Sequence, residues 1–303
     1  MHADQELEKK LSEGRLLNAS FDEVLYADDT IIFSHDVNAL EELLARIEQE
    51  GARYGMKLNK TKCEALCIRG GDRIRFGDGM LVPRCDECKY LGCLINDKGD
   101  PRREVNKRIS ECFLTWKRLE TFWKHSDCSV KVKLNIYDAV VRAKLIYGLE
   151  TVQVNDSLKQ KIDAFQLKGL RQILKMQTTF VNRGNTNELV FRRANALAGT
   201  THKKQDIVPM SVFYERQRRN AVKEIIAAEM NNPIRSVCAN ENLRLIEHAT
   251  KRIGRPRNNW WVQALTNFWN YLREQRIPAY RYVDLDVSNP DHISILIEQS
   301  NIE

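Results

Sequence analysis

Two adjacent carboxylates, Asp28 and Asp29, are the residues whose type and spacing could most directly do chemistry. They follow Tyr26 and an alanine, with short apolar runs on either side, Val24-Leu25 and Ile31-Ile32-Phe33. Such β-prone flanks predict two strands of a hairpin with the Asp pair at its turn. Adjacent carboxylates repel each other, so the pair favours a divalent cation, and Mg²⁺ is held by one or two carboxylates plus substrate phosphates. The alternative is an Asp-Asp turn selected for turn chemistry alone.

Short strands and one helix are predicted to position this turn. Leu40, Leu43, Leu44 and Ile47 recur at the helical period, with Asn38 as N-cap and Gly51 or Gly55 at the end. Strand-like runs follow at 66–68, 80–82 and 90–95, separated by the glycine-rich turns 70–72 and 77–79. A strand pair, a helix and further strands indicate an α+β layer.

Helices are predicted after the breaker cluster Asp97-Lys98-Gly99-Asp100-Pro101. Three apolar stripes indicate three successive helices whose aromatic residues belong to the core. The first stripe consists of Val105, Ile109, Cys112, Phe113, Trp116 and Leu119; the second of Val132, Ile136, Val140, Ala143 and Tyr147; and the third of Leu158, Ile162, Phe165, Leu170, Ile173 and Leu174. A second break is predicted at 183–187, and further helices at 214–230 and around Trp260-Trp261 and Phe268-Trp269.

Composition narrows the class of protein. The chain has 303 residues, 43% hydrophobic and 29% charged, which is typical of a globular protein of two or three compact units. No apolar run reaches the roughly 20 residues needed to cross a bilayer, and the first residues lack the pattern of a secretory signal, so we expect an intracellular protein with no membrane partner.

Basic residues are concentrated beyond Lys98, although the formal net charge is only +7. They are Arg102, Arg103, Lys107, Arg108, Lys117, Arg118, Lys124, Lys131 and Lys133. A basic second part after an acidic first part favours a protein that grips a polyanion and acts on it. Solvated helix faces explain the same charges equally well.

Eight cysteines indicate reduced thiols rather than a disulfide framework in such a protein. Cys63, Cys67, Cys85 and Cys88 could form a zinc site from two close pairs. We favour buried thiols, because Cys63 and Cys67 lie in an apolar run that is typical of a strand.

Several motifs occur in one order along the chain. Tyr26-Ala27-Asp28-Asp29 resembles the catalytic hairpin of reverse transcriptases, particularly those of non-LTR (LINE-type) retrotransposons. Segments similar to further parts of that family follow: Gly55 to Glu64, a palm motif; Lys89 to Ile95, a primer grip; Tyr147-Gly148-Leu149-Glu150, the end of a thumb helix; Thr186-Asn187-Glu188; and Gly254-Arg255-Pro256-Arg257 with Trp260. The resemblance extends from about Phe21 to Trp261.

The resemblance implies an organisation and a set of partners. It implies a partial polymerase palm at 1–100, a helical thumb at 101–180 and a helical basic region at 181–303. It also implies an RNA template, a DNA primer, Mg²⁺ as cofactor and a nuclear location.

The resemblance further assigns roles to residues. Asp28 and Asp29 would be catalytic metal ligands, with Asp28 the more direct, and Lys62 would assist the departing pyrophosphate. Tyr26 would support the primer end or template. The primer grip would be Lys89, Tyr90, Leu91 and Gly92; Arg252, Arg255 and Arg257 beside Trp260-Trp261 would hold nucleic acid by charge and stacking.

The chain departs from the family pattern at one essential point. A reverse transcriptase palm uses a third carboxylate from a strand well upstream of the hairpin, and none of the 25 residues before Tyr26 resembles that strand. Asp4 and Asp22 are poor substitutes, and the fingers are absent as well. We therefore expect little or no polymerase activity from this chain alone. The alternative function is a non-catalytic nucleic-acid-binding protein derived from such an element.

Overall fold

The computed structural model describes residues 23–68, 70, 73–199, 206–229, 231–240, 242–244 and 260–301. The chain divides into two compact units. One comprises residues 1–100, 224–257 and 279–303; the other comprises residues 101–223 and 258–278.

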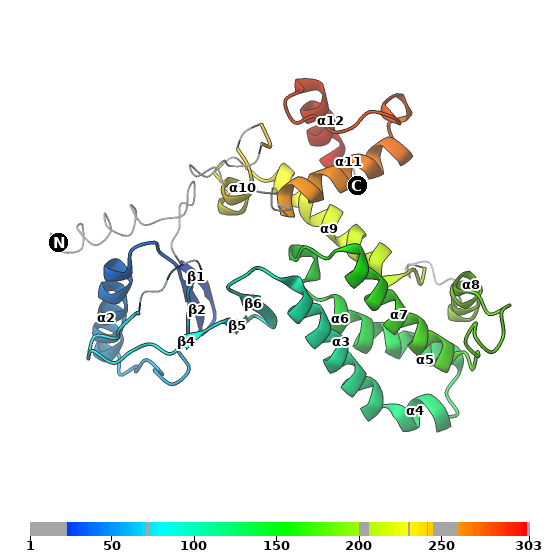
Figure 1. The fold of residues 1–303 in the computed structure, drawn as a ribbon, viewed down its shortest axis with the longest axis horizontal. Helices are drawn as coiled ribbons and strands as arrows, with labels where there is room; N and C mark the ends of the chain where they lie inside the picture. The colour runs from blue at the N-terminus through cyan, green and yellow to red at the C-terminus, as the bar shows by residue number, and fades with distance from the viewer. Residues whose placement is uncertain are drawn as a thin grey trace. The chain divides into compact units, whose positions relative to one another are not determined.

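The first unit contains the strands (Figure 1). Strands β1 (Glu23–Tyr26) and β2 (Asp29–Ile32) form an antiparallel hairpin, and so do β5 (Glu87–Tyr90) and β6 (Cys93–Asn96). A short parallel pair joins β3 (Ala65–Leu66) to β4 (Arg84–Cys85). The helices of this unit are α2 (Val37–Arg53), α10 (Pro233–Cys238) and α12 (Pro290–Ser300).

Helix α2 is fixed at its start by Asp36. The carboxylate of Asp36 accepts hydrogen bonds from the backbone N–H groups of Asn38 (2.8 Å) and Ala39 (3.3 Å). Asp36 rather than Asn38 is therefore the N-cap, and the predicted cap is wrong by two residues. An aspartate is an equally good acceptor in this position, so the sequence pattern alone did not separate them.

The predicted strand 66–68 is a strand only at Leu66, in β3. Two further predicted strands in this unit also differ from the structure. The run 90–95 is divided by a turn at Leu91-Gly92, because both residues have positive φ (46° and 84°). The run 80–82 contributes an isolated bridge, Arg75 with Leu81, closed by a turn whose Gly79 has φ 83°. Both differences have the same cause: apolar and β-branched residues indicate an extended chain, but they do not indicate where that chain turns.

The second unit is a bundle of helices (Figure 1). Its elements are α3 (Pro101–Arg118), α4 (Glu120–His125), α5 (Val130–Ile136), a π-helix η1 (Tyr137–Arg142), α6 (Ala143–Ile146), a 3₁₀ turn η2 (Leu149–Thr151), α7 (Asp156–Ile173), α8 (Asn187–Ala198), α9 (Met210–Ala227, which runs past the edge of the unit) and α11 (Trp260–Gln275). The 3₁₀ turn η3 (Pro278–Tyr280) follows α11.

A continuous apolar core holds this bundle together. Trp116 and Trp123 stack with ring centroids 4.5 Å apart, and Tyr137 meets Trp116 edge-on at 5.7 Å. Val105 and Leu145 are among the side chains that are completely buried. Each fully buried aliphatic side chain stabilises the fold by about 1.5–3 kcal/mol, so this core accounts for the bundle without help from the strands.

The predicted stripe of the second helix is wrong. Val132, Val140 and Tyr147 are exposed, whereas Leu134 and Val141 are buried. The difference begins at Val132, before the π-helix, and the buried residues Leu134, Tyr137, Val141 and Leu145 recur at ordinary helical spacing, so the predicted stripe was placed on the wrong face. The first and third stripes are confirmed in large part, with Phe113 a partly exposed exception.

The α+β class predicted from the sequence is confirmed: hairpins, α2 and short strands precede Asp100, and helices follow. The three-domain division remains a prediction.

Candidate functional site

The tip of the first hairpin is built from four residues. Tyr26 and Asp29 are the last paired residues of β1 and β2, so Ala27 and Asp28 form a two-residue turn. Such turns require positive φ at one or both positions, and Ala27 adopts φ 54°. A left-handed alanine costs roughly 1 kcal/mol relative to the ordinary regions, and strain of this kind is concentrated at functional sites.

Asp28 and Asp29 are exposed at this tip, and Tyr26 is 63% exposed. Among residues 23–68 and the other described parts of the chain, no side chain forms an ion pair or hydrogen bond with either carboxylate. Two adjacent, unneutralised carboxylates are therefore available to a cation. The structure leaves their sequence-derived role as metal ligands a prediction.

The second hairpin contains the predicted primer grip. Lys89 is exposed in β5, and Leu91-Gly92 form the two-residue turn with both φ values positive. Gly92 adopts this conformation freely, whereas Leu91 is strained in it. The hydroxyl of Tyr90 donates to the carbonyl oxygen of Val24 in β1 at 3.4 Å. The turn that carries the predicted grip thus belongs to a hairpin that contacts the hairpin with the acidic tip.

Lys62, the predicted proton donor, lies exposed in a turn after α2, with its backbone N–H bonded to the carbonyl oxygen of Asn59 (3.0 Å). The structure does not join it to the acidic tip. Lys60, two residues earlier, makes the ion pairs instead, to Glu48 (2.6 Å) and Asp78 (2.8 Å). Its ammonium also lies 4.9 Å from the centre of the Phe76 ring. Sequence reasoning missed Lys60, because its partners are far away along the chain.

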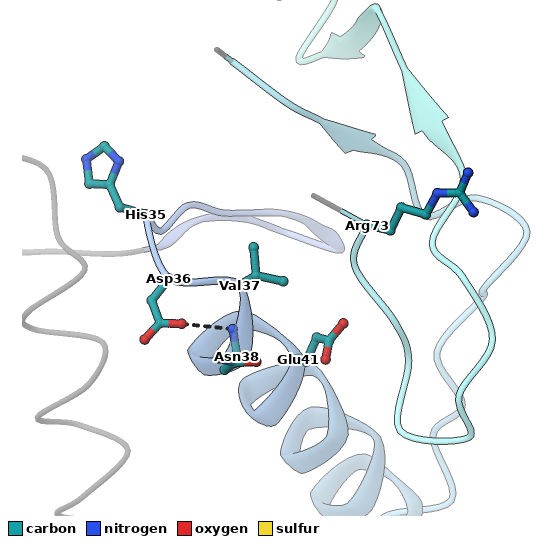
Figure 2. A pocket seen from close by; sticks show the side chains of 6 residues that line it. All are labelled: His35, Asp36, Val37, Asn38, Glu41 and Arg73. Atoms are coloured by element: carbon teal, nitrogen blue, oxygen red, sulfur yellow. Dashed lines mark hydrogen bonds between the residues drawn. The ribbon is translucent and has the colours of Figure 1, made fainter. Parts of the chain in front are cut away.

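A surface hollow of about 560 Å³ lies at the start of α2. Figure 2 shows His35 and Asp36 at the helix start, with Glu41 further along and Arg73 on a separate segment. Asp28 and Asp29 do not line it. Its charges are of both signs, and the Oε1 atom of Glu41 already accepts the backbone N–H of Arg75 at 2.7 Å, so it shows no preference for one ligand.

The Tyr-Gly-x-Glu motif, Tyr147 to Glu150, ends helix α6 in the second unit, as its resemblance predicts. Gly148 takes the left-handed conformation (φ 65°) that the chain reversal needs. The guanidinium of Arg108 donates to the carbonyl oxygen of Tyr147, and the indole N–H of Trp260 donates to that of Glu150 (2.8 Å). Two motifs far apart in the sequence therefore meet, and they do so through the backbone.

Several basic side chains of the bundle stabilise helix ends and are not free to grip a polyanion. Arg108 is buried, forms an ion pair with buried Glu104 and donates to Tyr147. Lys133 is buried and donates to the carbonyl oxygens of Trp123 (3.0 Å) and Ser126 (3.1 Å). For Arg108 and Lys133, the two interpretations of the basic residues, contact with a polyanion and exposure on a solvated helix face, are both wrong. These two cations are buried and bind carbonyl oxygens that a helix C-terminus leaves unpaired.

Arg218 is a further residue that the sequence did not reveal. It is 1% exposed and donates to the hydroxyl of Tyr214 (3.3 Å), the side chain of Gln153 (3.4 Å) and the carbonyl of Trp260 (3.0 Å). Its Nε has no partner among the described residues. The only signal was its place in a basic helix, which does not distinguish buried from exposed arginines.

Arg252, Arg255 and Arg257 lie outside the described residues, so their nucleic-acid role stays a prediction. All eight cysteines are free thiols. Cys63, Cys67, Cys85 and Cys88 are only partly buried, so the expectation of buried thiols is wrong for these four. Partial burial raises the pKa of Cys63, Cys85 and Cys88. Within the described ranges, no three His, Cys, Asp or Glu side chains gather as a metal site, at these thiols or at the acidic tip. No helix in those ranges is long and apolar enough to cross a membrane.

Comparison with known proteins supports the motifs that lie within residues 3–95. Residues 3–95 match the family of reverse transcriptases, described as RNA-dependent DNA polymerases. A transposon-derived protein of Caenorhabditis elegans is 23% identical over 142 residues, which cover 45% of this chain. The alignment spans 50% of that protein's length. The chain is thus similar to reverse transcriptases over residues 3–95, the stretch that holds the acidic tip and the Leu91-Gly92 turn.

Proposed function

We propose that this chain is part of an RNA-directed DNA polymerase of a LINE-type retrotransposon. The observation that carries the proposal is the exposed Asp28-Asp29 tip of a hairpin, inside the stretch that matches reverse transcriptases. The Tyr90 contact to the carbonyl of Val24 supports it, because that contact links this hairpin to the proposed primer grip. The partners would be an RNA template and a DNA primer, and the location implied by the resemblance is the nucleus.

The donor set at the tip fits Mg²⁺ in part. Asp28 and Asp29 offer unpaired carboxylate oxygens, which suit a metal that is also held by substrate phosphates. They do not suffice for a metal held by protein alone, since no third acidic, His or Cys side chain joins them among the described residues. The chemistry that bound Mg²⁺ supplies at such sites is charge stabilisation of the attacking and leaving oxygens.

The remaining residues of this proposal bind and orient. Tyr26, largely exposed beside the tip, would pack against the primer end or template, and Lys89 would meet a backbone phosphate. The Leu91-Gly92 turn would let a strand approach its backbone closely, because Gly92 has no side chain. Lys62 would donate a proton to, or neutralise, departing pyrophosphate. Its exposed position leaves it free to reach solvent-borne groups.

We expect the isolated chain to extend a primer poorly or not at all, because two carboxylates hold the nucleophile-activating metal weakly. The test is extension of a DNA primer on an RNA template with Mg²⁺, comparing the chain with Asp28→Ala. Processive extension that Asp28→Ala abolishes would refute the expected inactivity while supporting the polymerase assignment.

Metal binding tests the tip without requiring turnover. Mn²⁺ added in the presence of primer and template should broaden the NMR signals of the hairpin tip, because a paramagnetic ion relaxes nearby nuclei. Asp28→Asn should remove the broadening, and Glu23→Gln, at the opposite end of the same hairpin, should not. Equal broadening in Asp28→Asn would overturn the metal assignment.

The second candidate is a non-catalytic nucleic-acid-binding protein derived from such an element. The incomplete ligand set among the described residues favours it. Salt-sensitive binding of RNA, with no extension and no hairpin broadening by Mn²⁺, is the result that this candidate predicts and the polymerase assignment does not.

A further inference from the structure

A small cavity in the helical bundle has aromatic walls and lysine side chains at its rim. Its volume is about 160 Å³, and it lies among residues of α3, α4, η1 and α7. Lining residues include Phe113, Trp116, Tyr137, Phe165, Lys168 and Gln172. A cavity of about 150 Å³ lined by apolar side chains holds one benzene ring, so this space admits a single aromatic ring.

Gly169 lets α7 pack closely against two aromatic rings of the cavity wall, those of Tyr137 and Trp116. A Cβ atom at this position would lie 2.9 Å from the Cε2 atom of Tyr137 and 3.3 Å from the Cζ3 atom of Trp116. Cε2 is the ring carbon next to the one that bears the hydroxyl, so the hydroxyl end of Tyr137 lies beside the cavity wall.

The hydroxyl of Tyr137 is buried without a hydrogen-bond partner in the described part of the chain, and the residue is 3% exposed. Burial raises the pKa of this phenol, so the group keeps its proton and remains a donor. A buried hydroxyl without a partner costs about 1–3 kcal/mol. Tyr137 also begins the π-helix, and π-helical turns occur frequently at functional sites.

The rim of the cavity is cationic. The ammonium groups of Lys117 and Lys168 lie 5.9 Å and 5.7 Å from the ring centre of Phe113, which is 39% exposed. Glu120 also lines the cavity, but Lys124 (2.5 Å) and Lys117 (3.5 Å) neutralise it and lower its pKa. Lys168 has no carboxylate partner among the described residues, so a positive charge remains available at the mouth.

We propose that this cavity receives one unstacked base of a single-stranded nucleic acid, with an adjacent phosphate at Lys117 and Lys168. Aromatic walls bind the faces and edges of a base, and cations at the mouth bind the backbone that carries it. The side-chain amide of Gln172, whose Oε1 already accepts the indole N–H of Trp116 (3.1 Å), supplies a polar contact to the base edge. The proposal rests on the proposed function in one respect, namely that nucleic acid is the partner.

The test uses the full chain without metal or nucleotides, so loss of polymerase activity does not affect it. The probe is a 12-nucleotide single strand of thymidines with one central 2-aminopurine, whose fluorescence reports stacking, compared with a duplex of the same length. Phe113→Ala should weaken single-strand binding by about 5- to 150-fold, the range measured for one base–aromatic contact, and should abolish the fluorescence change on binding. Binding of the duplex should change much less.

Two further variants separate the parts of the site. Lys168→Ala should weaken binding and reduce the slope of log K against log salt by about 0.7, the value for one phosphate of a single strand. Lys161→Ala removes an exposed lysine of the same helix that does not line the cavity, and it should leave the fluorescence change intact.

Two results would overturn the proposal, and they differ in what else they affect. If Phe113→Ala and Lys168→Ala bind the single strand like the unchanged chain while duplex binding persists, the cavity assignment fails and the proposed function stands. If the chain binds neither probe at low salt, both fail together.

Discussion

The hairpin that carries the acidic tip and the helical bundle are stabilised in different ways. In the bundle, Val105, Leu145 and Ile162 are completely buried, whereas Leu25 in the hairpin is 62% exposed. The side chains of β1 are all exposed, so the hairpin is held by its ladder, by its turn and by the Tyr90 bond. Because an isolated two-stranded hairpin is marginally stable in water, the acidic tip depends on contacts such as the Tyr90 bond, and the bundle depends on its own core.

The two regions also use cations differently. Arg108 in the bundle is buried with Glu104, while Lys60 beside α2 is partly exposed between Glu48 and Asp78. Breaking a buried pair leaves an uncompensated charge away from water, whereas an exposed pair is screened. The same type of contact is therefore essential in one region and minor in the other.

The largest expected effect comes from breaking the buried pair. Arg108→Ala leaves Glu104, which is 1% exposed, without its cation and the carbonyl of Tyr147 without its donor. We expect the free energy of unfolding of the bundle to fall by about 3–5 kcal/mol, measured by urea denaturation followed by tryptophan fluorescence. Arg118→Ala, at an exposed position of the same helix, should change it by less than about 0.5 kcal/mol. Equal effects of the two variants would remove the distinction between the regions.

Replacing a helical glycine by alanine should change stability by an intermediate amount, with opposite signs in α7 and α2. Gly169→Ala in α7 places a Cβ 2.9 Å from the Tyr137 ring, so overpacking of about 1–3 kcal/mol should outweigh the gain of up to about 1 kcal/mol in helix propensity. Gly51→Ala in α2 meets the Cβ and the backbone oxygen of Met56, both at 3.8 Å, which are ordinary contacts, so the propensity gain should stabilise α2. Hydrogen exchange of each helix measures both. If both substitutions stabilise their helices, the Tyr137 ring can move to accommodate a Cβ at position 169, and the bundle is not more tightly packed there than α2 is at Gly51.

The sequence predicted elements well where one periodicity was dominant. The predicted third stripe from Leu158 coincides with α7, and the acidic pair does lie at a hairpin tip. Both rest on local signals, because a helical stripe and a turn need no information from distant residues. The family resemblance was likewise accessible, because it depends on the order of short motifs; of the predicted span from about Phe21 to Trp261, the family match supports the part up to residue 95.

The rest depended on contacts between distant residues. The residues 130–149 contain more apolar positions than one face can bury, so the sequence could not choose between Val132 and Leu134 without knowing which face packs against the rest of the bundle core. Nothing in the sequence distinguishes buried Arg108 from its exposed neighbours. One of its partners is the carbonyl oxygen of Tyr147, 39 residues away, and the other is the carboxylate of Glu104, one turn earlier in the same helix. The cavity arises from the meeting of α3, η1 and α7 and has no sequence signature.

The smallest effect concerns Lys60 and follows from the signs of two pKa shifts. Hydrogen bonds to Asp78 and then Glu48 raise the pKa of Lys60 above its ordinary 10.5, and the bond from Lys60 lowers the pKa of Asp78 below its ordinary 3.8. A raised lysine pKa stabilises the folded state below the ordinary value, and this is lost as pH rises through the raised pKa. A lowered aspartate pKa stabilises it above the ordinary value, and this is lost as pH falls through the lowered pKa. The contact between α2 and the turn at Phe76 should therefore be constant near neutrality and weaken at both extremes.

An NMR titration of the Lys60 Cε signal measures this contact directly. Asp78→Asn should lower the Lys60 midpoint, because it removes the first of the two hydrogen-bonded carboxylates, and Asp86→Asn, which is exposed and not paired with Lys60, should leave it unchanged. Raising the salt concentration to about 0.5 M should reduce the difference, because the Debye length then falls well below its value of about 10 Å at 0.1 M. If the Lys60 midpoint instead resists both salt and Asp78→Asn, its pairing is as protected from water as that of Arg108, and the difference between exposed and buried cations in the two regions would disappear.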